Sequence, residues 1–458
     1  MVKKEKANIW QVISEVAREG TEITVDSTPE TRKGGLAQVA TEDIGSSAPP
    51  FRLAPEAHEK LMKPVKKDLV PPVGEPQILP EPVYPSRPWL KEGKNKLAYH
   101  LATGWRGFRC WVVPYVRSRL HPNNLRPMLS YLFTDYKCNL NCYYCWAFDN
   151  KVKGMTEDVA KRSIDWLHSI GCRVIAIMGG EPLIRPKFIH KIVYYGTKRG
   201  FFVYVPTNGR LMTPDIIDRL GDAGVATINL AVDCLDEKPG LPKALNLIRP
   251  QFEYLVKKQQ KYGYMISFNI NICHNNMDDV RELTELAYAN ACSTDYHINE
   301  PPLMQHDHFQ HLSNNPTYIR PEDHPKVDEL IDHLIDCSRR GYMMVNPLSY
   351  FKSMKRFMRG QLDSWPCRAG LNTMVIRTDG TLAPCFAMYS AKYDWGVLEK
   401  QKFEVGHLTE MKENCSPHCM STCNWTIAHH YNDYRVIWMA IKQLMHGHQG
   451  VRAISQLD

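Results

Sequence analysis

Residues 128–145 read MLSYLFTDYKCNLNCYYC, and this stretch decides the fold of the chain. Its apolar run, 128–134, is typical of a buried β-strand. Three cysteines then fall within one eight-residue window, at Cys138, Cys142 and Cys145. Three thiolates on one short loop can bind three irons of a single cubane iron–sulfur cluster, which leaves the fourth iron open to a ligand that is not protein. The alternative is a structural zinc site, but zinc would need a fourth donor and the sequence offers none nearby.

The pattern that begins with this strand repeats to about residue 300. Apolar runs alternate with amphipathic ones, and such alternation requires a parallel sheet with crossover helices. We expect strands at 128–134, 173–178, 201–206, 226–232, 265–272 and 295–299. The patterns between and after them predict helices at 156–170, 214–220, 243–262, 278–291 and 324–341. Six units fit a partial (β/α)6 barrel better than a full eight-fold one, so the predicted fold class is α/β.

Two further motifs follow the next two predicted strands. The second strand ends in MGGEP at 178–182, and the third ends in TNG at 207–209. Together with the three cysteines, and with Tyr144 just before the last of them, these motifs resemble the signature of the radical S-adenosylmethionine (radical SAM) enzymes. The resemblance covers about residues 125–300.

The resemblance implies a role for each motif. The three cysteines would hold a [4Fe-4S] cluster whose open iron binds the amino and carboxylate groups of S-adenosylmethionine. Gly179, Gly180 and Glu181 would lie at the methionyl ammonium, since glycine permits close backbone approach and a carboxylate complements a cation. Tyr144 would lie beside the adenine, and Asn208 of the third motif is a further expected cofactor-binding residue.

The ribose of the cofactor often contacts the fourth strand in this family. Asp233 is the candidate here, while Ala231 stands where a serine is common. The other reading of Asp233 is a loop carboxylate that caps the next segment. Asn271 and Asn269 on the fifth strand are weaker candidates, and their spacing of two places them on one face of that strand.

The chemistry that the resemblance implies rests on the cofactor. One electron from the reduced cluster cleaves S-adenosylmethionine into methionine and a 5′-deoxyadenosyl radical, which abstracts hydrogen from an unactivated C–H bond. The expected partner is therefore a one-electron reductant such as flavodoxin or ferredoxin. The protein must orient the substrate and exclude water.

A second group of cysteines lies near the C-terminus. Twelve residues separate Cys367 from Gly380, and four more separate Gly380 from Cys385, across an Asp-Gly pair that predicts a hairpin. This opening is similar to the SPASM/twitch extension of radical SAM enzymes, and it implies one auxiliary [4Fe-4S] cluster. Five cysteines are available for its four corners: Cys367, Cys385, Cys415, Cys419 and Cys423. Which of them is spare stays open, and a zinc knuckle is the alternative for the same cysteines.

The regions outside the barrel differ in composition. Eleven prolines between residues 49 and 88 predict an extended N-terminal segment. We divide the chain into a Pro-rich extension (1–95), a basic aromatic lead-in segment (96–127), the radical SAM barrel (128–345) and a small cysteine-rich domain (346–458). A helix is predicted near 434–446 in the last of these.

The lead-in region contains five arginines and no carboxylate between residues 101 and 130, with large aromatic residues interleaved. Such a segment can lie on an anionic membrane surface or hold an acidic substrate. The alternative is a docked helix whose arginines pair with distant carboxylates.

Composition narrows the class of protein. The chain has 458 residues, a net charge of +8, 43% apolar and 23% charged residues, which excludes a wholly disordered or fibrous protein. No apolar run reaches membrane-spanning length and no secretory signal is visible, so we expect a cytoplasmic protein, with peripheral membrane contact as a further hypothesis. The expected substrate is a lipid-like or other small metabolite, and no nucleic-acid partner is expected. A peptide-modifying maturase and a non-enzymatic iron–sulfur or zinc-binding protein are the other two hypotheses.

Overall fold

The computed structural model describes residues 105–145, 152–300, 315–388, 408–409, 412–413 and 415–431. The predicted Pro-rich extension and the helix predicted near 434–446 lie outside these residues. No helix within the described ranges is long and apolar enough to cross a membrane.

Six parallel strands form the core of the sheet and follow one another in sequence order. They are β1 (Leu129–Asp135), β2 (Val174–Gly179), β3 (Phe202–Thr207), β4 (Thr227–Ala231), β5 (Met265–Ile272) and β6 (Ser293–Ile298). Each begins or ends within two residues of its predicted limits. The partial (β/α)6 barrel is therefore confirmed.

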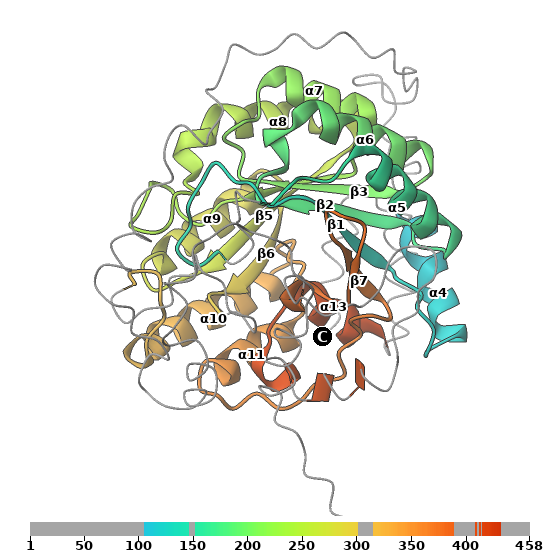
Figure 1. Cartoon of the computed structure of the whole chain (residues 1–458). Helices are drawn as coiled ribbons and strands as arrows, with labels where there is room; N and C mark the ends of the chain where they lie inside the picture. Colours follow the sequence, from blue (N-terminus) through green and yellow to red (C-terminus); the bar gives the residue numbers. More distant parts are fainter. Residues whose placement is uncertain are drawn as a thin grey trace, which may run out of the picture.

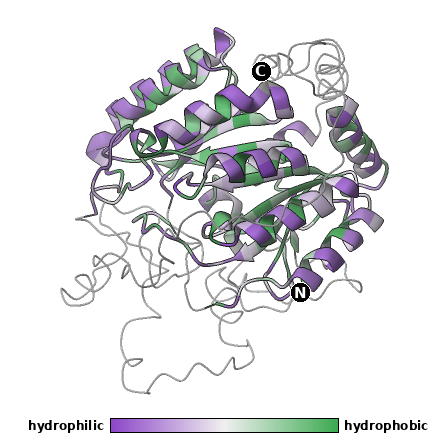
Figure 2. Ribbon diagram, turned by 90° about the horizontal axis from the view of Figure 1, so that it is seen from above, coloured by the Kyte–Doolittle hydropathy of each residue, from purple (hydrophilic) through white to green (hydrophobic). Residues whose placement is uncertain are grey.

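Helices connect successive strands and cover the outer side of the curved sheet (Figure 1). They are α5 (Glu157–Ser169), α6 (Pro186–Lys198), α7 (Pro214–Ala223), α8 (Arg249–Tyr262) and α9 (Met277–Ala289), followed by α10 (His324–Arg339) and α11 (Leu348–Phe357). Figure 2 shows the hydrophilic residues of these helices on the outside and the hydrophobic residues of the sheet beneath them.

Local sequence explains where individual helices begin. The side chain of Thr156 accepts a hydrogen bond from the backbone N–H of Val159, which caps α5. The prediction of one helix over 243–262 was wrong, because a short 3₁₀ turn at Leu245–Ile248 precedes α8. Pro250 suits the first turn of α8, since it lacks the N–H that a helix interior requires.

The predicted hairpin extends the barrel sheet. Its first strand, β7 (Thr373–Ile376), pairs in parallel with β1, and β8 (Leu382–Ala383) pairs antiparallel with β7. The helix α13 (Thr422–Tyr431) then contacts both β6 and β7 on the inner side of the sheet (Figure 1). The cysteine-rich region thus fills the lateral opening of the partial barrel.

The basic aromatic lead-in docks against the barrel. A π-helical turn at Phe108–Val112 leads into α4 (Val113–Leu120), and the ring of Trp111 packs edge-on against Phe202. The hydroxyl of Tyr431 donates to the backbone oxygen of Ser118 over 2.8 Å, which ties α13 to α4.

The lead-in arginines donate mainly to backbone carbonyls. Arg126 donates to Ile170 at the end of α5, Arg109 to Gly200 after α6, and Arg106 to Gly224 after α7. Each bond satisfies a carbonyl at a helix C-terminus, where cations are favoured. The docked arrangement is therefore observed, with helix ends as acceptors for these three arginines.

Candidate functional site

The three-cysteine loop follows β1 directly and is held by its neighbours. The backbone N–H of Glu181 donates to Lys137 over 2.7 Å, and that of Tyr143 donates to Gly240 over 3.1 Å. Cys142 is buried, and Cys138 and Cys145 are half-buried. The loop is therefore held by the residues that follow β2 and by the segment after β4.

Gly179 and Gly180 allow this packing. A Cβ on Gly179 would lie 2.5 Å from the backbone oxygen of Asp135, and one on Gly180 would lie 2.2 Å from that of Lys137. Both distances are below van der Waals contact with backbone atoms that cannot move away cheaply. These two glycines therefore let the end of β2 approach the cysteine loop.

Glu181 is buried and accepts hydrogen bonds within the protein. Its Oε1 accepts from the backbone N–H of Leu183 over 2.9 Å and from the hydroxyl of Thr207 over 2.8 Å. Its Oε2 accepts from the backbone N–H of Asn208 over 2.7 Å. Burial raises the pKa of the Glu181 carboxyl, and these hydrogen bonds oppose that rise. Glu181 thus joins the ends of β2 and β3.

Asn208 extends the same connection to the cysteine loop. Its side-chain amide donates to the side-chain oxygen of Asn139 over 2.8 Å, and its own oxygen accepts from the backbone of Arg210. Residues of both motifs, Glu181 and Asn208, therefore support the loop that carries the three thiols.

A second set of side chains lies on the other side of the loop. The hydroxyl of Tyr144 donates to Asp233, whose second oxygen accepts from the backbone N–H of Asn271 over 2.9 Å. Burial raises the pKa of Asp233, and the nearby charge of Lys243 opposes the rise. The ammonium of Lys243 lies 5.1 Å from the centre of the Tyr144 ring.

Lys243 was missed by the sequence reasoning. Burial by itself would lower the pKa of Lys243, but the charges of Cys142 and Asp233 raise it above its usual value. The lysine thus places a positive charge beside the three thiols. Lys243 was predicted to lie at the start of the helix 243–262. A lysine on a helix is usually exposed to solvent, so the sequence did not indicate a place in the site.

The donor set fits a metal cluster. Burial raises the pKa of the Cys142 thiol to about 12, Lys243 opposes this, and the neighbouring Cys145 raises it further. All three cysteines are free of disulfide bonds. Bound iron would offset this mutual repulsion, since a coordinating thiol releases its proton and the positive charge of the metal neutralises the thiolate.

A cavity of about 510 Å³ runs from the cysteine loop into the barrel. Tyr144, Cys145 and Asp233 line one end of it, together with Asn269 and Asn271. Elsewhere its walls are mainly apolar and aromatic, and its lining includes Trp111, Tyr131, Met178, Phe202, Tyr204, Met265 and Ile427. Two aromatic residues of the lead-in, Trp111 and Tyr115, thus line the cavity, whereas three of its arginines bind helix ends. Glu181 and the two glycines lie behind the loop rather than in this lining.

Four of the five C-terminal cysteines act on one another electrostatically. Burial raises the pKa of Cys415, and the charges of Cys385 and Cys367 raise it further. Burial likewise raises the pKa of Cys419, with Cys415 and Cys385 among the charges that add to the effect. The sequence reasoning also missed Lys412, which is buried among these cysteines. Burial lowers the pKa of Lys412, and the charges of Cys367, Cys385 and Cys415 oppose this effect.

Cys423 has different surroundings. It lines the cavity, and the hydroxyl of Tyr131 hydrogen-bonds to its thiol. Burial raises the pKa of Cys423 to about 11, and that hydrogen bond opposes the rise. The next charged group acting on it is Asp295 of β6 rather than another cysteine.

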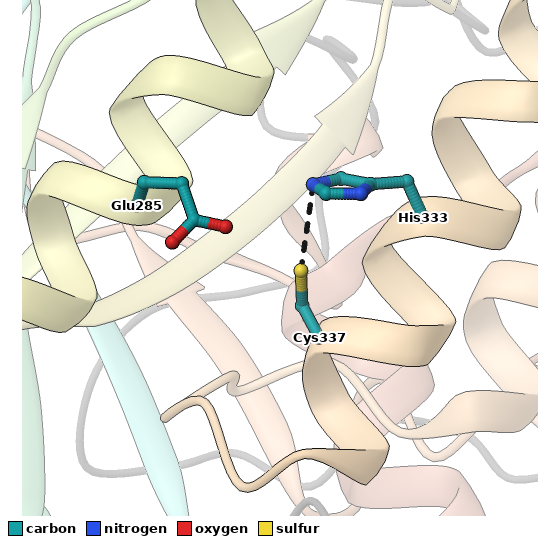
Figure 3. Close-up of side chains that lie close together, drawn as sticks. All are labelled: Glu285, His333 and Cys337. Atoms are coloured by element: carbon teal, nitrogen blue, oxygen red, sulfur yellow. Dashed lines mark hydrogen bonds between the residues drawn. The ribbon is translucent and has the colours of Figure 1, made fainter.

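A further group of potential metal ligands lies on the outer helices (Figure 3). Glu285 of α9 lies close to His333 and Cys337 of α10, with the ligand atoms within 4.8 Å of one another. Arg340 donates to the Cys337 sulfur over 3.1 Å, and Tyr342 donates to Glu285 over 2.6 Å. Because the Arg340 cation would repel a metal ion, we interpret this group as a link between α9 and the end of α10.

Comparison with known proteins agrees with this geometry. Residues 134–287 match the model of the radical SAM superfamily. The AdoMet-dependent heme synthase of Methanosarcina barkeri is 34% identical over 158 residues, which cover 33% of this chain and 44% of that protein. The GTP 3′,8-cyclase of Clostridium perfringens is 25% identical over 185 residues, covering 39% and 57%. The matches thus span about half the length of these relatives.

Among solved structures, Streptococcus suis SuiB bound to its precursor peptide SuiA is 14% identical, with a TM-score of 0.48. That alignment covers 67% of this chain and 78% of SuiB. The sequence match spans β1 to α9, which includes the cysteine loop and the strand ends that support it. Residues 134–287 therefore form a radical SAM domain.

Proposed function

We propose that this chain uses a [4Fe-4S] cluster and S-adenosylmethionine to activate an unactivated C–H bond of a lipid-like or other small-metabolite substrate. The observation that carries the proposal is the cysteine loop, whose Cys145 lines a cavity of about 510 Å³ together with Lys243 and Asp233. Cavities of this size are typical of small-molecule sites.

The residues of the site have different roles in this proposal. Cys138, Cys142 and Cys145 would hold the cluster, which together with S-adenosylmethionine supplies the hydrogen-abstracting chemistry. Lys243 complements a carboxylate, and Asp233 complements hydroxyl groups. The lead-in segment and α13 close the barrel and limit the access of water to the cavity.

We also propose that Cys367, Cys385, Cys415 and Cys419 hold the auxiliary cluster, which leaves Cys423 as the spare thiol. The mutual electrostatic influence of these four cysteines supports this assignment. The hydrogen bond between Tyr131 and Cys423 in the cavity supports a separate role for Cys423. We also propose domain boundaries after residues 95, 127 and 345. A one-electron reductant such as flavodoxin or ferredoxin would supply the electron to the cluster.

The walls of the cavity support the choice of substrate class. Apolar atoms contribute most of the exposed lining, and polar side chains such as Asn229, Asp295 and His297 are distributed among them. A largely apolar substrate that also carries polar groups would match this lining.

The test is anaerobic reconstitution followed by measurement of 5′-deoxyadenosine. We expect reduced wild-type protein to cleave S-adenosylmethionine and the Cys145→Ala variant to lose this activity. Cys292→Ala is the matched control, because Cys292 is buried at the start of β6 and belongs to neither cysteine group. Absence of cleavage by the wild type under strong reduction would favour the non-enzymatic alternative.

The substrate class is tested by adding cell extracts fractionated by chemistry. Faster formation of 5′-deoxyadenosine with an organic-solvent lipid extract would support the proposal. If a peptide fraction accelerates the reaction instead, and protease treatment abolishes that effect, the chain is a peptide-modifying maturase.

A further inference from the structure

A second pocket, of about 300 Å³, lies outside the barrel between the lead-in segment and the C-terminal ends of α5 and α6. Its lining contains four arginines and one histidine beside a valine and two glycines: Arg109, Val113, Arg117, His168, Gly171, Arg173, Arg199 and Gly200. The helices α5 and α6 end at the opposite edge of the sheet from the cysteine loop. This arginine pocket is therefore separate from the radical SAM cavity.

The positive charge of the arginine pocket is poorly compensated. Arg199 pairs with Asp165 over 2.9 Å, and among the described residues no other arginine of the lining forms an ion pair with a carboxylate. Arg109 donates to the backbone of Gly200, and Arg173 donates to the backbone of His168. Backbone carbonyls satisfy individual N–H groups but do not neutralise a charge.

The arginines also repel one another. Burial lowers the pKa of Arg173, and the nearby charges of Arg117 and Arg109 lower it further. Burial lowers the pKa of His168, and Arg173, Arg199 and Arg109 add to this effect against the opposing charge of Asp165. A bound anion would relieve both effects.

We propose that the arginine pocket binds a phosphoryl group. Each guanidinium has five donors in a planar fork that matches phosphate oxygens, and the backbone bonds of Arg109 and Arg173 use only one nitrogen of each. The volume of the pocket suits a phosphate or pyrophosphate group rather than an extended polymer. This proposal is independent of the radical chemistry.

The phosphoryl group has two plausible sources, a lipid headgroup and a soluble phosphate ester. The outer face of the same segment presents large apolar side chains, with Leu120 70% exposed and Trp105 58% exposed. Apolar side chains beside an arginine pocket would suit a headgroup at a bilayer surface. A soluble ester would use the arginines alone.

The first experiment is calorimetry of the full-length protein with inorganic pyrophosphate. We expect binding that weakens with salt and falls about ten-fold or more in Arg117→Gln, since each charge-assisted contact contributes substantially. Arg162→Gln is the matched control, because Arg162 lies on the exposed face of α5 and pairs with Asp158. Equal affinity in wild type and Arg117→Gln would overturn the proposal, and so would absence of binding at low salt.

A second measurement needs no variant of the pocket. The pKa of His168, followed by NMR, should rise when pyrophosphate is added, because the anion offsets the neighbouring arginines. An unchanged His168 titration under saturating pyrophosphate would also overturn the proposal.

Vesicle sedimentation then separates the two sources. Binding to phosphatidic acid vesicles but not to neutral phosphatidylcholine vesicles, reduced by both Arg117→Gln and Leu120→Ser, would identify a lipid headgroup. Pyrophosphate binding without vesicle binding would identify a soluble ester.

Discussion

At the residue scale, Glu181 shows how a motif residue can act through its neighbours. The resemblance implied that its carboxylate lies at the methionyl ammonium. In the structure both carboxylate oxygens accept hydrogen bonds from nearby residues: Leu183, Thr207 and Asn208. The glycines before it approach the backbone of the cysteine loop in the same way. This motif therefore positions the cysteine loop.

The Glu181→Ala variant should be markedly less stable. It leaves two buried backbone N–H groups without acceptors, and each such group costs about 1–3 kcal/mol. Denaturant titration of the apo protein measures the loss, with Glu157→Ala as control, since Glu157 forms only solvent-exposed ion pairs. Wild-type stability combined with weaker S-adenosylmethionine binding would instead support a direct contact with the ammonium.

Cys423 and Cys419 provide a matched pair only four residues apart. We expect Cys423→Ala to retain the auxiliary iron, because its thiol bonds to Tyr131 in the cavity. Cys419→Ala should lose about four irons. Iron analysis after anaerobic reconstitution distinguishes them, and loss of iron in both variants would make Cys423 a ligand.

At the scale of elements, the helix ends explain the docking of the lead-in. In a parallel β/α unit every helix ends at the same edge of the sheet, so their unsatisfied carbonyls gather there. Arginines from one segment bind the ends of α5, α6 and α7 in turn. Arg109 and Arg117 line the arginine pocket. They are therefore the lead-in arginines that the membrane hypothesis would use to contact anionic lipid.

The interface of α6 with α7 should give a measurable pH dependence. Burial lowers the pKa of His190 on α6 to about 4, and the charge of Arg219 on α7 contributes. Between about pH 6.5 and 4 the unfolded chain binds a proton that the folded chain does not. The free energy of unfolding should therefore decrease as the pH falls through this window.

Urea titrations at several pH values test this expectation. His190→Gln should show a flatter decrease than the wild type over that window. The exposed His121 provides the control, and His121→Gln should keep the wild-type slope. An unchanged slope in His190→Gln would contradict the assignment.

At the scale of the whole molecule, two segments far apart in sequence close one barrel. The lead-in packs beneath the cavity, and α13 contacts β6 and β7 from the inner side. Tyr115 donates to the backbone of Tyr431, and Tyr431 donates to that of Ser118. The cavity therefore depends on residues from both sides of the radical SAM domain.

The whole chain should hold two [4Fe-4S] clusters, or about eight irons after anaerobic reconstitution. Replacing Cys138, Cys142 and Cys145 together by alanine should leave about four irons and abolish cleavage of S-adenosylmethionine. The two cysteine groups lie on different elements, so each cluster should assemble without the other. Saturation of the wild type at four irons, or stoichiometric zinc at the C-terminal cysteines, would contradict the two-cluster proposal.

The sequence by itself determined the barrel and the position of the cysteine loop. The strand β5 was predicted at its observed limits, and the other five core strands within two residues, because alternating apolar and amphipathic runs are local signals. The loop 138–145 follows β1 for the same local reason. The pair Asp379 and Gly380 also predicted the hairpin of β7 and β8.

Only the tertiary structure decided which distant residues meet. The pairing of β7 with β1, the contact of Tyr131 with Cys423 and the place of Lys243 beside the thiols all join segments separated by many residues. Such contacts depend on how the sheet curves and where its opening lies, and no periodicity along the chain records either. The partners of Glu181 and of the arginines were hidden for the same reason, because a charged residue in a sequence does not show whether it faces solvent, a ligand or a helix end.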